Sequence, residues 1–165
     1  MDFSNKTVIV TGGANGIGRG IASLYAEKGA NVVIADKDEE NGKLVASDIQ
    51  KQGGKALFIK TDVRLEEEIV RLMATAYQTY GAIHILINNA GISEFKPLFE
   101  LSVEEWDNVI HTNLRSVFLA SREAAKYMRK NEHGGSIVNI ASTRAIMSEP
   151  NSEAYAATKG GIVAL

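Results

Sequence analysis

The segment that decides the fold reads Thr11-Gly12-Gly13-Ala14-Asn15-Gly16-Ile17-Gly18. A β-branched run at residues 7–10 precedes it and predicts a strand. Apolar residues at helical spacing follow it, and Gly29 offers a stop for that helix. A strand that enters a glycine-rich turn and leaves as a helix suits a pyrophosphate, because the N–H groups and dipole of the helix N-terminus attract negative charge. The G-x-x-x-G-x-G spacing differs from the usual G-x-G-x-x-G fingerprint, so an ordinary tight turn stays open as an alternative.

The bulk composition is that of a globular domain. The 165 residues are 45% hydrophobic and 23% charged, and the net charge of −2 gives no electrostatic support for nucleic-acid binding. The chain has no cysteine, which excludes disulfides and thiolate metal sites, and its three histidines lack metal-ligand spacing, so we predict no metal site. The N-terminal residues do not resemble a signal peptide and no apolar run approaches membrane-spanning length, so we expect a cytoplasmic protein with no membrane or nucleic-acid partner.

Strand-like and helix-like segments alternate along the whole chain. The strand-like segments are apolar runs rather than strict alternations, which is typical of a parallel sheet covered on both faces. They lie at residues 7–10, 31–35, 55–60, 83–87 and 136–140. Helical patterns separate them, including residues 39–52, 66–80 and a long one that opens with a capping box at Ser102 and continues to about residue 130. We predict one α/β domain over residues 1–165, a Rossmann-type doubly wound parallel sheet with strand order 3-2-1-4-5.

Polar and small residues follow the predicted strands, where a doubly wound sheet binds its ligand. Asp36 ends the second strand, at an offset from Gly18 that suits an acidic residue bound to a ribose diol. Asp62 and Val63 follow the third strand, where a carboxylate either binds an adenine amino group or caps a turn. Asn89, Ala90 and Gly91 follow the fourth strand, and these residues either line a flat cofactor or form a polar turn. Residues 92–100 and 143–151 contain apolar side chains that either form an apolar substrate entrance or pack their own loops; they are Phe95, Leu98, Phe99, Ile146 and Met147.

Tyr155 and Lys159 lie four residues apart in the last helical pattern and therefore share one face. An ammonium group beside a phenol stabilises the phenolate, which suits the pair to acid–base catalysis near neutral pH. Taken alone, the same spacing also occurs on ordinary solvent-exposed helix faces, so that alternative stays open.

Taken together, these motifs resemble the short-chain dehydrogenase/reductase family, and the resemblance covers essentially the whole chain. The matching features are the glycine turn, Asp36, Asp62, the Asn88-Asn89-Ala90-Gly91 segment, Asn113, Ser142 and the Tyr155-x-x-x-Lys159 pair. Ser142 lies 13 residues before Tyr155, as in the family. The similarity is greatest to the bacterial group that includes 3-oxoacyl-carrier-protein reductases and glucose 1-dehydrogenases.

The resemblance implies an NAD-dependent oxidoreductase that transfers a hydride between the nicotinamide and a secondary alcohol or ketone. It implies that Tyr155 is the general acid or base, that Lys159 assists it and binds the nicotinamide ribose, that Ser142 binds the substrate oxygen and that Asn113 holds a water linked to the lysine. The implied cofactor site consists of Gly12, Asn15, Gly16, Ile17, Gly18, Asp36, Asp62, Val63, Asn89, Ala90, Gly91, Tyr155 and Lys159. Asp36 favours NAD over NADP because a carboxylate repels a 2′-phosphate, although Arg19 and Lys37 lie near enough in sequence to soften that repulsion.

The sequence departs from the family after Leu165, where members usually add two strands and a segment that covers the substrate. We therefore expect a C-terminally truncated form in which the fifth strand is an open sheet edge. The alternative to an active enzyme is a catalytically silent NAD(H)-binding module. Family members often form homodimers or tetramers through the helices that carry Asn113 and Tyr155, so we also expect a homo-oligomer.

Overall fold

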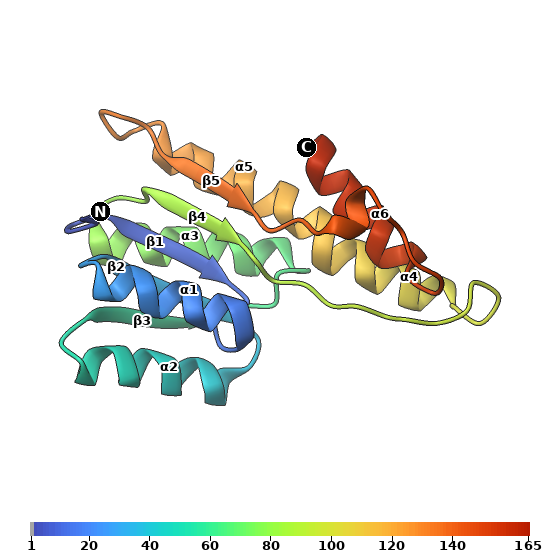
Figure 1. Cartoon of the computed structure of the whole chain (residues 1–165). Helices are drawn as coiled ribbons and strands as arrows, with labels where there is room; N and C mark the ends of the chain where they lie inside the picture. The colour runs from blue at the N-terminus through green and yellow to red at the C-terminus, as the bar shows by residue number, and fades with distance from the viewer. Residues whose placement is uncertain (1) are drawn as a thin grey trace.

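A computed structural model describes residues 2–165, and Figure 1 shows a twisted sheet flanked by helices. The strands are β1 (Thr7–Thr11), β2 (Asn31–Asp36), β3 (Lys55–Lys60), β4 (Ile85–Asn88) and β5 (Ser136–Asn139). The helices are α1 (Gly16–Glu27), α2 (Glu39–Lys51), α3 (Glu66–Tyr80), α4 (Val103–Ile110), the π-helical η1 (His111–Arg115), α5 (Ser116–Met128), the 3₁₀ turn η2 (Thr143–Ala145) and α6 (Glu153–Ala164). None of the helices described in residues 2–165 combines the length and the apolar character needed to cross a membrane.

All five strands run parallel in the order β3-β2-β1-β4-β5, which confirms the predicted sheet. The predicted bounds are correct for β3 and within two residues for the others. Strand β1 is central, so the glycine turn that follows it opens at the middle of the carboxyl edge. The order reverses between β1 and β4, and a ligand crevice is expected at such a point.

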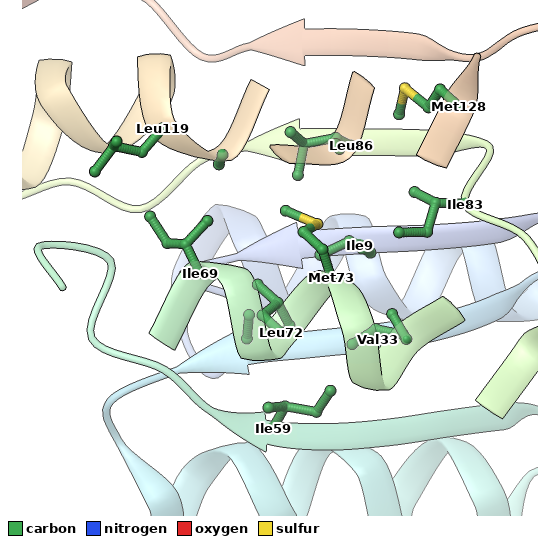
Figure 2. Packing of buried hydrophobic residues seen from close by; sticks show 14 residues of the cluster. Ile9, Val33, Ile59, Ile69, Leu72, Met73, Ile83, Leu86, Leu119 and Met128 are labelled. Atoms are coloured by element: carbon green, nitrogen blue, oxygen red, sulfur yellow. The ribbon is translucent and has the colours of Figure 1, made fainter. Parts of the chain in front are cut away.

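Alternate residues of the strands enter two separate cores. Ile9 and Val33 face α3 and α5, where they pack with residues such as Leu72, Met73 and Leu119 (Figure 2). The residues next to them in the strands point the other way and pack with α1 and α2; this second core includes Val8, Val10, Val32, Ile34, Ala22, Val45 and Ile49. Burial on both faces explains why the strands read as continuous apolar runs.

The buried face of α2 differs from the predicted one. The pattern placed Leu44, Val45, Asp48 and Ile49 on one face, but Leu44 is 48% exposed and Asp48 bonds outward to Arg19. Val45 and Ile49 are buried together with Gly42 and Ala46. Gly42 lies directly against the ring of Phe58, which comes within 2.1 Å of the position that a Gly42 Cβ would occupy. The helix therefore packs through Gly42 and Ala46 as well as through Val45 and Ile49.

The predicted helix from residue 102 to about 130 is interrupted by a π-helical turn. Its start is confirmed, because Ser102 and Glu105 make both hydrogen bonds of a capping box. At His111–Arg115 the pattern changes to a π-helix before α5 continues to Met128. A π-turn rotates the residues on either side of it relative to each other and is frequent at functional sites. Asn113 lies inside this turn and is fully buried.

Candidate active site

An open pocket of about 400 Å³ lies at the carboxyl edge of the sheet, beside the glycine turn. Ten of the predicted cofactor residues line it: Gly12, Asn15, Gly16, Ile17, Asp36, Asp62, Val63, Asn89, Ala90 and Gly91. Gly18 is buried in the first turn of α1 and does not line the pocket, and Tyr155 and Lys159 also lie outside the lining. The structure thus brings together the ends of four strands in one concave surface.

The glycine turn has the shape that the sequence suggests for binding a pyrophosphate. Gly12 and Gly16 have φ values of 65° and 51°, in the left-handed region that glycine adopts without strain. Helix α1 begins at Gly16 with no acidic residue in its first turn and no side-chain cap from Asn15. The first N–H groups of α1 therefore keep their capacity to bind an anion.

Asp36 is held in place by backbone donors on two sides. Its Oδ2 accepts a hydrogen bond from the Ala14 N–H and its Oδ1 from the Asp38 N–H, each at 3.0 Å. Asn15 donates to the Asp38 carboxylate at 3.1 Å, so a second acidic group lies beside the turn. Two cations were expected to soften the repulsion between Asp36 and a 2′-phosphate. Arg19 forms an ion pair with Asp48 at 3.6 Å, whereas Lys37 lines the pocket.

Asp62 is paired with an arginine that the motifs do not single out. The Arg64 guanidinium donates to both carboxylate oxygens, with Nη2 2.6 Å from Oδ2, and this hydrogen bonding lowers the pKa of Asp62. Arg64 also reaches Asn108 of α4 through Nη1 at 2.8 Å. Both residues line the pocket. The D-x-R spacing is the signal for Arg64, because an aspartate in a turn commonly accepts from the backbone N–H two positions later, and the Arg64 N–H donates to Asp62 in this way at 3.0 Å. No sequence pattern indicates Asn108.

Asn89 ties the glycine turn to β4. Its Nδ2 donates to the carbonyl oxygens of Thr11 at 3.0 Å and Gly12 at 3.1 Å. The backbone N–H groups of Asn89 and Ala90 both donate to the Thr11 hydroxyl at 3.1 Å. The strand ends that frame the pocket are therefore joined by side-chain bonds as well as by the sheet.

Tyr155 and Lys159 lie on one face of α6, as their spacing predicts. The Lys159 Nζ lies 5.5 Å from the centre of the Tyr155 ring and donates to the Ile140 carbonyl oxygen at 2.6 Å. Burial lowers the pKa of Lys159 below its usual value, because a desolvated ammonium is less stable. The Tyr155 ring also packs against Phe95, at 6.2 Å between ring centres.

Ser142 and Asn113 reach the same region from different elements. Ser142 caps η2, where its Oγ accepts from the Arg144 N–H at 3.2 Å, and η2 packs against α6. Asn113 bonds through its amide to both backbone groups of Ile92 at 2.8 Å, and to Thr158 of α6 at 3.3 Å. Two of the four predicted catalytic residues therefore lie on α6, Asn113 is bonded to that helix, and Ser142 caps the turn that packs against it. Within residues 2–165, no group of three or more histidine and acidic side chains is arranged to hold a metal ion.

Comparison with known proteins identifies relatives of this arrangement. Residues 6–165 match a family model described as short chain dehydrogenase. An uncharacterized oxidoreductase of Thermotoga maritima is 45% identical over 163 residues, which cover 99% of this chain and 63% of that protein. A cyclopentanol dehydrogenase of a Comamonas species is 40% identical over 159 residues, covering 96% of this chain and 63% of that protein. The chain thus spans less than two thirds of these relatives.

The fold has close counterparts among solved structures. A short chain dehydrogenase from Mycobacterium smegmatis superposes with a TM-score of 0.95 at 34% identity, over all of this chain and 71% of that one. The two structures share the parallel sheet with helices on both of its faces.

Proposed function

The chain belongs to the short-chain dehydrogenase family, and on that premise we propose that it is an NAD-dependent oxidoreductase acting on a secondary alcohol or ketone. The observation that carries the proposal is the combination of the glycine-turn pocket with the Tyr155–Lys159 pair on α6, a helix joined to the pocket-lining Ile92 through Asn113 and Thr158. A bound nicotinamide would supply the hydride chemistry, and the protein residues would bind, orient and exchange the proton.

The residues of the pocket fit a dinucleotide. The free first turn of α1 suits the pyrophosphate, and Asp36 suits a ribose diol because each of its oxygens keeps capacity for a further hydrogen bond. The backbone bonds that hold Asp36 also prevent it from turning away from a 2′-phosphate. We therefore infer a preference for NAD over NADP.

The residues around α6 fit the handling of one proton. The Ser142 hydroxyl accepts a bond from Arg144, so its own proton is available to a substrate oxygen. Lys159 uses one of its three N–H donors on Ile140 and keeps two for ribose hydroxyls and for the phenol. In oxidation, Tyr155 would take the proton from the substrate hydroxyl, and in reduction it would return it.

The loops around Tyr155 favour an uncharged, apolar substrate. Phe95, Ile146 and Met147 are all exposed, Ile146 at 91%, so they do not pack their own loops. The two cations of these loops are already paired, Lys96 with Glu105 and Arg144 with Glu149. The name of the Comamonas relative denotes an alicyclic alcohol, and we propose the same class here.

The experiment is a comparison of Tyr155→Phe with Tyr77→Phe in the presence of NAD and cyclopentanol. Loss of a general acid–base group should lower kcat by about 100- to 10,000-fold while NADH binding is retained. Tyr77 packs on Tyr127 in the α3–α5 layer, so its variant should keep wild-type turnover. Unchanged turnover in Tyr155→Phe would refute the mechanism. NADH binding by the wild type without turnover of any secondary alcohol would favour the binding-module alternative.

A further inference from the structure

Thr158 lies between Tyr155 and Lys159 in sequence, and its side chain contacts the π-helical turn η1 through Asn113. Its side chain is fully buried between α6 and the π-helical turn. The hydroxyl donates to the Tyr155 carbonyl oxygen at 2.7 Å and accepts from the Asn113 Nδ2 at 3.3 Å. A threonine hydroxyl has one proton, and here it is used on the backbone of the turn of α6 that carries Tyr155.

Asn113 continues the same connection to the loop after β4. Its Oδ1 accepts from the Ile92 N–H and its Nδ2 donates to the Ile92 carbonyl, both at 2.8 Å. The second N–H of Nδ2 is the one that reaches Thr158. Every polar atom of the Asn113 side chain is thereby bonded, and Ile92 itself lines the nucleotide pocket.

We propose that Thr158 is a positioning residue, whose hydroxyl links the Ile92–Asn113 unit to the Tyr155 turn of α6 so that the pocket and the acid–base group keep a fixed relation. This inference rests on the proposed function, in which Tyr155 exchanges the proton. Thr158 touches neither substrate nor cofactor and acts through Asn113 and the Tyr155 backbone.

The physical reason lies in burial. Loss of the hydroxyl leaves one Asn113 N–H without a partner in a site from which water is excluded, and an unpaired buried donor is costly. The Asn113 amide can then find another partner for this N–H only by moving from its present position, and that movement weakens its bonds to Ile92. Bonds that share a buried amide in this way strengthen one another, so the loss extends beyond the 3.3 Å contact.

The test compares Thr158→Val, which keeps the shape but removes the hydroxyl, with Thr158→Ser, which keeps the hydroxyl. The matched control is Thr79→Val, because Thr79 also donates from a helix to a backbone carbonyl, that of Thr75 at 2.8 Å in α3, away from the site. The first readout is the hydrogen-exchange rate of the Ile92 amide, measured on the full chain without any ligand. The second is the kcat for oxidation of cyclopentanol, compared with the KM for NAD.

We expect Thr158→Val to exchange the Ile92 amide roughly tenfold faster than wild type, and Thr158→Ser to stay within about twofold. We expect the kcat of Thr158→Val to fall by about tenfold with the KM for NAD little changed, because Tyr155 loses its fixed relation to the pocket, and we expect Thr158→Ser to restore kcat. Thr79→Val should change neither readout. Should Thr158→Val fail to fold, Thr158→Ala takes its place, since alanine is a better helix former.

Equal Ile92 exchange in Thr158→Val and wild type would overturn the inference, as would a Thr158→Ser that behaves like Thr158→Val. Faster exchange with an unchanged kcat would also overturn it, because the hydroxyl would then be structural only. Absence of turnover in the wild type counts against the proposed function alone, and the exchange rates then decide the link by themselves.

Discussion

The substitution Gly18→Ala tests how closely α1 approaches the turn that precedes it. A Cβ at Gly18 would lie 2.1 Å from the Gly12 carbonyl oxygen and 2.5 Å from the Asn89 Nδ2. Neither atom can move freely. Gly12 is bonded through its N–H to the Ala35 carbonyl at 2.8 Å, and the Asn89 amide makes two bonds to the backbone of the turn.

The magnitude follows from three contributions. Forcing a methyl into a packed site costs about 1–3 kcal/mol. Displacing the Asn89 amide costs about 1 kcal/mol for each of its bonds to Thr11 and Gly12. Alanine recovers about 1 kcal/mol through its higher helix propensity. We expect Gly18→Ala to lower the free energy of unfolding by about 2–4 kcal/mol, a large share of the roughly 5–15 kcal/mol of a typical domain.

Gly20→Ala is the matched control, because Gly20 lies in the same helix and its Cβ would meet no atom within 4 Å. It should raise stability by about 0.5–1 kcal/mol. Urea unfolding followed by far-UV circular dichroism measures both variants, and NADH titration should show weaker binding only for Gly18→Ala. Equal stability of the two alanine variants would refute the reasoning, because the close approach would then carry no energetic weight.

Three further substitutions test other contacts. His84→Asn should remove a pH dependence of stability: His84 Nδ1 accepts from the Thr7 N–H at 3.0 Å, and burial, together with the charge of Lys6, lowers the pKa of His84. The unfolded chain then binds the proton more readily, so the stability of the wild type should be complete above about pH 6.5 and fall below it. Asparagine keeps a hydrogen-bond acceptor but does not titrate, so the melting temperature of the variant should not fall in this way when thermal melts are recorded at several pH values. Asp36→Asn should raise the affinity for NADPH relative to NADH by roughly tenfold in fluorescence titrations, and an unchanged ratio would show that Asp36 does not set the preference. Ser102→Ala should cost about 1 kcal/mol in the melting experiment, because it removes a capping box; no loss would mean that the start of α4 is held by its tertiary contacts.

The fold was predictable because its signals are local. The strand β3 and the helix α3 match their predicted bounds, since apolar strand-like runs and helical periods act within a few residues. The π-turn was not predictable, because its Asn113 bonds to Ile92, 21 positions earlier, and to Thr158, 45 positions later. Contacts between residues so far apart in sequence produce no local sequence pattern from which they could be predicted.

In the site, too, local signals were predictable and contacts between distant residues were not. Asp36 and Asp62 follow apolar strands, so the topology alone brings them to one edge, and both line the pocket there. The bond from Arg64 to Asn108 joins the segment after β3 to α4, and no local pattern in the sequence marks it. The close approach of Gly42 in α2 to the ring of Phe58 is likewise a contact that no local pattern marks. Residue types at strand ends were informative, whereas the partners chosen by packing required the structure.

The bonds from Asn89 to the glycine turn also set an order of events during synthesis. Thr11 and Gly12 leave the ribosome more than seventy residues before Asn89, the side chain that fixes their carbonyls. The turn therefore cannot acquire its final geometry until β4 has paired with β1, a contact between segments distant in sequence. Nucleotide affinity should accordingly appear as a late step, so that cofactor binding reports completion of the central sheet rather than formation of the first strand–helix unit.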